Sequence, residues 1–151
     1  YLRFGGTAYK HANGVEAINY FTKQACEELH KQNPSLIVSA AVMPEPSGMI
    51  YYYGQDIPTI SKYLDVIVPM IYKGNYAQGT SWIKSTTQKF IDMSNGADIW
   101  TGLQSYYSDD DVSKLPASEL KSDSKAGIDG GAKGIILFRF GLFNLFDFNT
   151  L

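Results

Sequence analysis

Strand-like segments recur along the chain at a nearly constant interval. Their starts lie near Leu36, Val66, Ile99 and Gly134. This spacing of roughly 30 to 35 residues is the size of one βα unit. Helical patterns are expected over about residues 13–33, 56–64, 80–93 and 116–128. A right-handed series of such units builds either an open doubly wound sheet or a closed eight-stranded barrel.

Length and the first residues favour a partial barrel. A complete barrel needs about 250 residues, whereas the chain has 151. The chain also begins inside a strand-like segment, and no Gly-rich phosphate loop follows any strand, although open nucleotide-binding sheets normally have one. We therefore expect an α/β fold in which residues 1–151 form a single partial domain of a larger chain. It would be the C-terminal half of a parallel (β/α)8 TIM barrel, about strands 4 to 8. A self-contained open α/β domain of flavodoxin type that binds a small ligand is the alternative.

Composition narrows the classes of function. The formal net charge is −2 and the basic residues are scattered, so neither nucleic acid nor an anionic membrane surface is expected as a partner. The longest apolar runs are far shorter than the roughly 20 residues that cross a bilayer, so no membrane span is expected. The single cysteine, Cys26, excludes an internal disulfide and a cysteine metal cluster. His11 and His30 have no partner at ligand spacing. We expect no metal and no organic cofactor.

In both architectures the ligand site lies at the carboxyl ends of the parallel strands. The residues at these ends are unusually polar and aromatic. In chain order they are Arg3, Tyr9, Glu45, Tyr72, Lys73, Asn75, Gln104, Tyr106 and Arg139. Aromatic faces stack on pyranose rings, amide and guanidinium groups bond hydroxyls, and a carboxyl group can act as an acid or a nucleophile. The set therefore predicts a sugar site.

Glu45 is the candidate catalytic acid. It follows Met43 in the alternating phase of its strand, and prolines on both sides stiffen it. A hydrogen-bond acceptor for substrate or a solvated loop residue are the alternatives. The other residues are candidate substrate contacts, and the alternatives are a core tyrosine for Tyr72 and structural ion pairs for Arg3 and Arg139.

The strand that starts at Val66 contains a proline, Pro69. Proline has no N–H to donate to a neighbouring strand, so the ladder is expected to loosen or bulge there and to direct Tyr72 toward the mouth of the barrel. An early end of the strand is the alternative.

Five stretches of the chain together resemble a known family. They are YLRFGG, LIVSAAVMPE, LDVIVPMIYKGNY, TGLQSYYS and GAKGIILFRFG. In order and spacing they resemble the last five strands of glycoside-hydrolase-like TIM barrels, a group loosely similar to family 18 chitinases and polygalactosaminidase-type enzymes. The resemblance covers nearly the whole chain. It places the key carboxylate of the fourth strand immediately before Tyr1, outside this chain.

The resemblance implies a glycosidase-like domain that hydrolyses glycosidic bonds in a polysaccharide, such as a cell-wall or extracellular glycan. The reaction would be acid-assisted, with the fourth-strand carboxylate and Glu45 as the pair. The resemblance also implies a secreted or cell-surface protein. Expected partners are the polysaccharide and either the missing N-terminal half of the barrel or a second copy of the chain. A carbohydrate-binding barrel without catalysis is the alternative from a different class of function.

Overall fold

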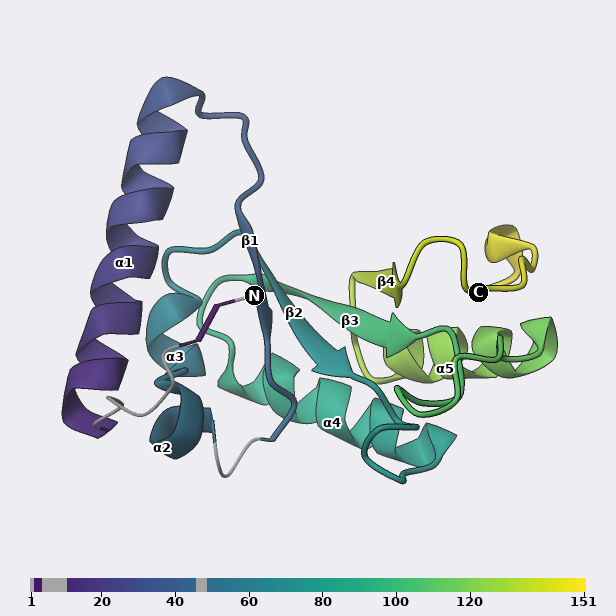
Figure 1. Ribbon diagram of the computed structural model, residues 1–151. Helices are drawn as coiled ribbons and strands as arrows, with labels where there is room; N and C mark the ends of the chain where they lie inside the picture. Colours follow the sequence, from purple (N-terminus) through teal and green to yellow (C-terminus); the bar gives the residue numbers. More distant parts are fainter. Residues whose placement is uncertain (1, 4–10, 46–48) are drawn as a thin grey trace.

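The computed structural model describes residues 2, 3, 11–45 and 49–151. Helices and strands alternate along these residues (Figure 1). The helices are α1 (His11–Gln32), α2 (Met49–Tyr53), α3 (Ile57–Ile60), α4 (Thr80–Met93), α5 (Ala117–Asp129) and the short 3-10 helix η1 (Phe148–Thr150). The strands are β1 (Ser39–Val42), β2 (Val66–Ile71), β3 (Asp98–Gln104) and β4 (Gly134–Phe138).

Within the described part of the chain, the strands form one parallel sheet in the order β1-β2-β3-β4. Strand order therefore follows chain order and never reverses. A flavodoxin-type sheet needs a reversal, because its helices are divided between the two faces. The flavodoxin alternative is therefore wrong. In Figure 1 the helices α1, α3, α4 and α5 follow one another around one side of the sheet, which is the arrangement of a barrel wall.

The hydrophobic core lies between the sheet and these helices. The strand residues that face it are almost completely inaccessible to solvent, and they include Ile67, Ile71, Ile99 and Leu103. They pack against helix side chains that are equally buried, such as Ile60, Ile83 and Phe90. Removing this apolar surface from water is the main force that holds the helix layer on the sheet.

The N-terminal elements differ in detail from the sequence-based expectation. The strand expected over residues 36–43 is shorter, because Leu36 still belongs to the turn after α1 and its N–H donates to the carbonyl of Asn33. Most of the strand expected at residues 1–4 lies outside the described residues. Leu2 is described, and its N–H donates to the carbonyl of Ala41 at 3.0 Å, so Leu2 lies beside β1.

Asp65 fixes the start of β2 relative to β1 and α1. Its carboxylate accepts the backbone N–H of Val38 at 2.7 Å and contacts His30 Nε2 at 2.9 Å. The hydrogen bond from Val38, aided by His30, lowers the pKa of Asp65 below its usual value although partial burial opposes this. These contacts set the register at the amino ends of the strands.

Pro69 interrupts the pairing of β2 with β3. The partners are Val66 with Asp98, Ile67 with Ile99, Met70 with Gly102 and Ile71 with Leu103. Val68 and Pro69 have no partner in β3, yet the register is the same on both sides of this gap. The expected loosening of the ladder is therefore confirmed, and the expected bulge is not found, because a bulge would insert a residue and shift the register.

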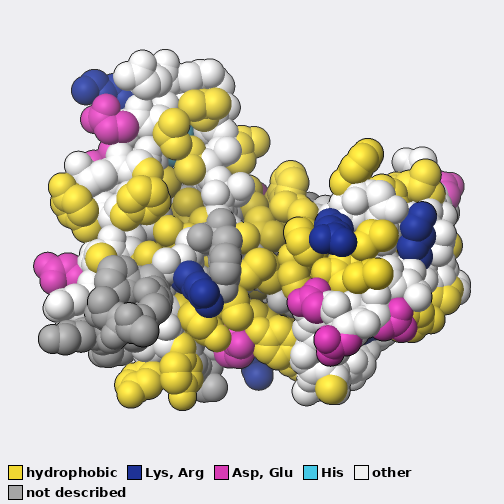
Figure 2. Space-filling view, viewed as in Figure 1, with side chains coloured by type: hydrophobic (Ala, Val, Ile, Leu, Met, Phe, Trp, Pro, Cys, Tyr) yellow, Lys and Arg dark blue, Asp and Glu magenta, His cyan; other side chains and the backbone are white. Residues whose placement is uncertain are grey.

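The opposite face of the sheet is not covered by these helices. Side chains alternate between the two faces along a strand. The side chains that point to this open face include Met70 of β2, Gln104 of β3, and Ile136 and Phe138 of β4. The exposed fractions of Ile136 and Phe138 are 37% and 42%. Figure 2 shows hydrophobic side chains gathered across the middle of the molecule, over the sheet. No helix in the described ranges is long and apolar enough to cross a membrane.

Candidate active site at the carboxyl ends of the strands

Three aromatic rings at strand ends meet at the carboxyl edge of the sheet. They belong to Tyr72, Tyr106 and Phe138, and we call them the aromatic group. The Tyr72 ring stacks on Phe138 with centroids 5.5 Å apart and an interplanar angle of 14°. The Tyr106 ring lies 6.4 Å from Phe138, and the guanidinium carbon of Arg139 lies 5.9 Å above the Tyr106 ring. The structure thus brings together three of the predicted residues, Tyr72, Tyr106 and Arg139. Phe138 was not predicted, although it has the same strand phase as Ile136 and ends the last strand.

Burial of Tyr72 controls its protonation. Burial, with smaller contributions from Tyr106 and Asp109, raises the pKa of Tyr72 to about 12. Its hydroxyl group is therefore protonated at neutral pH and can donate a hydrogen bond. Within the described part of the chain it makes no hydrogen bond, so this donor is available to a ligand.

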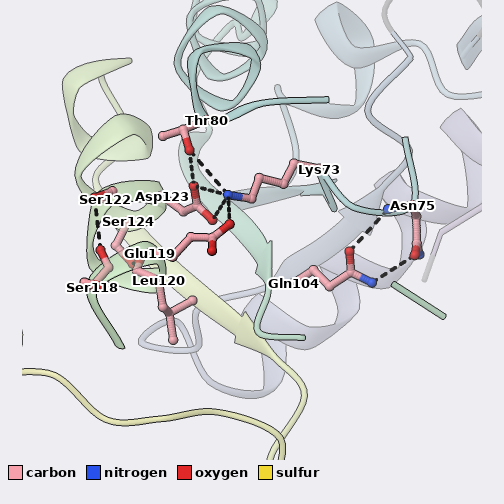
Figure 3. A network of polar contacts seen from close by, with 10 residues as sticks. All are labelled: Lys73, Asn75, Thr80, Gln104, Ser118, Glu119, Leu120, Ser122, Asp123 and Ser124. Atoms are coloured by element: carbon pink, nitrogen blue, oxygen red, sulfur yellow. Dashed lines mark hydrogen bonds and ion pairs between the residues drawn. The ribbon is translucent and has the colours of Figure 1, made fainter. Parts of the chain in front are cut away.

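A hydrogen-bonded network joins the loops after β2 and β3. Gln104 Nε2 donates to Asn75 Oδ1 at 2.9 Å, and Gln104 Oε1 accepts the Asn75 backbone N–H at 3.4 Å. Asp109 accepts from Asn75 Nδ2 at 2.8 Å and from the Tyr106 hydroxyl at 2.9 Å. Figure 3 shows Asn75 and Gln104 facing one another. Because these amides bond mainly to each other and to Asp109, their first effect is to hold the two loops together.

Glycine at position 74 allows the same two loops to touch. A Cβ atom on Gly74 would lie 1.6 Å from the carbonyl oxygen of Tyr107. No larger side chain fits without separating the loops. Asp109 and Gly74 were not predicted as site residues, because Asn75 and Tyr107, which they contact, lie more than 30 residues away in the chain.

Lys73 follows Tyr72 but points in another direction. Its Nζ donates to Asp123 Oδ1 at 2.8 Å, to Glu119 Oε1 at 2.8 Å and to Thr80 Oγ1 at 3.3 Å. Figure 3 shows the Lys73 side chain directed toward α5, away from Gln104 and Asn75. Its three N–H groups are thus directed at protein acceptors, and we assign Lys73 to a structural cluster with Asp123, Glu119 and Thr80.

Burial governs both charges in this cluster. The side chains of Lys73 and Asp123 are 12% and 1% exposed. Burial favours the neutral amine of Lys73, but hydrogen bonds to Asp123 and Glu119 outweigh this and raise the pKa of Lys73. Burial also raises the pKa of Asp123, and contacts with Lys73 and Thr80 only partly offset this effect. Each charge is therefore tolerated in the interior because the other is present.

Glu45 lies just beyond the carboxyl end of β1. Its Oε1 accepts a hydrogen bond of 2.7 Å from the hydroxyl of Tyr76. Its Oε2 is shielded from solvent and has no hydrogen-bond partner among the described residues. A neighbouring cavity of about 340 Å³ is lined by Met43, Pro44, Met70, Tyr72, Asn75 and Tyr76. The cavity thus lies between the segment that precedes Glu45, Tyr72 at the end of β2 and the loop that carries Tyr76.

The remaining predicted residues lie elsewhere or outside the described residues. The guanidinium carbon of Arg3 lies 5.9 Å above the ring of Tyr53 in α2, a contact separate from the aromatic group at β2, β3 and β4. Tyr9 lies outside the described residues. Among the described residues, no group of three or more His, Cys, Asp or Glu side chains is arranged to hold a metal ion.

Comparison with known proteins identifies the family. Residues 2–95 match the family described as "Putative glycosyl hydrolase domain". The chain belongs to this family. The match includes Glu45, Tyr72, Asn75 and Tyr76, whereas Gln104, Tyr106 and Arg139 lie beyond it. No curated protein sequence matches the chain.

A solved structure shows the same fold. The glycoside hydrolase domain of PgaB (BpsB) from Bordetella bronchiseptica superposes with a TM-score of 0.66 at 14% sequence identity. The similarity covers 83% of this chain and 37% of the PgaB chain. At this identity the similarity establishes the fold. The expected partial TIM-barrel-type fold is therefore confirmed, and the resemblance to glycoside-hydrolase-like barrels is confirmed by the family match.

Proposed function

We propose that this chain contributes to the active site of a glycoside hydrolase that cleaves glycosidic bonds in a polysaccharide, with Glu45 as a catalytic carboxyl group. The observation that carries this proposal is the state of the Glu45 carboxyl group. One oxygen is held by Tyr76, and the other is shielded and unpartnered among the described residues, while the residues on either side of this contact, Pro44 and Tyr76, line a cavity at the carboxyl edge of the sheet.

Glycosidases commonly use two carboxyl groups on either side of the bond that is cleaved. One protonates the leaving oxygen, and the other attacks the sugar carbon or activates water. Glu45 would supply one of them through Oε2. The second would come from the fourth strand of the barrel, as the resemblance to glycoside-hydrolase-like barrels implies. The match of residues 2–95 to a glycosyl hydrolase family supports the class of reaction.

The aromatic group provides a surface for the sugar. Tyr72 and Phe138 offer apolar ring surface next to the hydroxyl donor of Tyr72 and the exposed guanidinium of Arg139, and the buried ring of Tyr106 packs against Phe138 and Arg139. Ring faces beside polar donors suit a pyranose, which has apolar faces and hydroxyl groups at its edges. A polysaccharide substrate would in turn suit a secreted or cell-surface protein, and we include this localisation in the proposal.

The test is hydrolysis of soluble oligosaccharides. The full-length protein, which contains this chain together with the fourth strand of the barrel, is incubated with chitin-, galactosaminan- and cellulose-type pentasaccharides, and new reducing ends are measured. Glu45→Gln is expected to lower kcat by about 100-fold or more, since general acid–base catalysis contributes on this scale. The matched control is Glu28→Gln, because Glu28 is an exposed glutamate of α1 paired only loosely with Lys31 at 3.8 Å.

Two results would contradict the proposal. Full activity of Glu45→Gln would remove Glu45 from the reaction. Binding of an oligosaccharide without cleavage by the wild-type protein would favour the alternative of a carbohydrate-binding barrel without catalysis. Saturable binding is measured by calorimetry on the same oligosaccharides.

A further inference from the structure

Tyr76 supplies the only hydrogen bond that Glu45 receives through its carboxyl group in the described part of the chain. Tyr76 lies in the loop between β2 and α4, whereas Glu45 follows β1. The two residues are therefore brought together by the parallel pairing of β1 with β2. The 2.7 Å separation is the usual length of a hydrogen bond donated by a hydroxyl group.

The Tyr76 ring is held by contacts that do not involve Glu45. It packs against Trp82 in the first turn of α4, with centroids 5.3 Å apart and an interplanar angle of 30°. Its backbone N–H donates to the carbonyl of Tyr72 at 3.3 Å. The position of the Tyr76 hydroxyl is thus set by β2 and by α4, and it does not depend on the carboxylate that it contacts.

The loop that carries Tyr76 is itself tied down at several points. Asn75 bonds to Gln104 and Asp109, and Lys73 is held by the buried carboxylate of Asp123. Ala77 adopts a positive φ of 49°, a conformation that a residue other than glycine keeps only where its surroundings impose it. A side chain on so constrained a loop has little freedom to follow Glu45 if Glu45 moves.

We propose that Tyr76 is a positioning residue that fixes the Glu45 carboxyl group through Oε1, beside the cavity that Pro44 and Tyr76 line. The inference rests on the proposed function, because it assigns Tyr76 a role that acts only through Glu45. Occupying Oε1 leaves a single oxygen for chemistry and restricts rotation of the carboxyl group about its last bond. Catalytic groups must be held within a fraction of an ångström of their productive position, and side-chain hydrogen bonds of this kind supply that restraint.

A double-mutant cycle on oligosaccharide hydrolysis tests the inference. Tyr76→Phe keeps the ring against Trp82 and removes the hydroxyl, so kcat is expected to fall about 10- to 100-fold. KM is expected to change little, because the ring that borders the cavity remains. In the Glu45→Gln background, Tyr76→Phe is expected to change kcat less than about twofold, since a residue that acts only through Glu45 has nothing left to orient. The matched control is Tyr107→Phe, an exposed tyrosine in the loop after β3.

The outcomes separate this inference from the proposed function. If Glu45→Gln lowers kcat but Tyr76→Phe does not, the proposed function stands and the positioning role is wrong. If Tyr76→Phe lowers kcat by the same factor in both backgrounds, Tyr76 acts independently of Glu45 and the inference is again overturned. If Glu45→Gln keeps full activity, or if no oligosaccharide is cleaved, the proposed function fails and the inference fails with it. Equal unfolding midpoints of wild type and Tyr76→Phe show that a loss of kcat does not come from unfolding.

Discussion

The cluster of Lys73, Asp123, Glu119 and Thr80 makes a quantitative prediction about stability. Lys73→Met keeps the length of the aliphatic stem and removes the ammonium group. Asp123, of which 1% is exposed, then keeps a buried negative charge with Thr80 as its remaining hydrogen-bond partner. Removing one member of a buried ion pair typically costs about 3–5 kcal/mol. We expect Lys73→Met to lower the free energy of unfolding by this amount.

Replacing both charges should cost much less. The pKa of Asp123 is raised by burial even beside Lys73, so ionising this carboxyl group in the folded protein remains costly. Buried ion pairs can therefore be exchanged for apolar residues of similar size with little net loss. The double variant Lys73→Met/Asp123→Leu is expected to recover most of the stability that Lys73→Met alone loses.

The assay is urea unfolding at pH 7, followed by circular dichroism. The control is Lys125→Met, which breaks an exposed pair with Asp129 whose side chains are 60% and 42% exposed, and little or no change is expected. Two results would refute the assignment of Lys73 to a buried structural pair. One is a loss of unfolding free energy below about 1 kcal/mol for Lys73→Met. The other is a loss for the double variant that exceeds the summed losses of Lys73→Met and Asp123→Leu. Lys73 would then again be a candidate contact for substrate.

Two further predictions follow from the rim of the site. Gly74→Ala is expected to cost about 2 kcal/mol or more, because its Cβ would overlap the carbonyl oxygen of Tyr107, whereas Gly79→Ala, with no atom within 4 Å of the new Cβ, should cost a few tenths of a kcal/mol. Similar unfolding midpoints for the two variants would contradict the close approach of the loops. The pKa of Tyr72 is raised to about 12 from 10.0. The unfolded chain therefore releases this proton at a lower pH than the folded protein. The free energy of unfolding should be unaffected by Tyr72 ionisation below pH 10 and should fall as the pH rises from 10 toward 12. Burial also raises the pKa of Tyr106, so ultraviolet titration should show more than one late-ionising tyrosine, and Tyr72→Phe should remove one of them; an unchanged number of late-ionising tyrosines in that variant would contradict the assignment.

Much of the fold could be predicted from local sequence pattern. The alternation of helices and strands, the parallel sheet and its likeness to a barrel follow from a repeated spacing that few architectures satisfy. The ends of individual elements were predicted less well. Leu36 was expected in a strand and lies in a turn. The turn that follows α1 continues to Leu36, whose N–H donates to the carbonyl of Asn33, so the apolar run begins before the strand does.

The candidate site was predicted by place more than by residue. The carboxyl ends of the strands do carry the aromatic group, as the parallel arrangement requires. However, Tyr76, Asp109 and Phe138 were missed, and Lys73 was predicted to face the ligand but points toward α5. The neighbouring residues Tyr72 and Lys73 show why, because the directions of side chains beyond a strand end depend on partners that local pattern does not reveal.

The amino-acid sequence by itself determined the order of helices and strands and the interval between them, because both depend on patterns within short segments. Only the tertiary structure decided which polar groups meet. The hydroxyl of Tyr76 reaches Glu45, and the ammonium of Lys73 reaches Asp123, across separations of 31 and 50 residues. Such pairings arise when strand register and helix packing place distant segments side by side. A buried charged group is then stabilised by the opposite charge or hydrogen-bonding group that lies next to it.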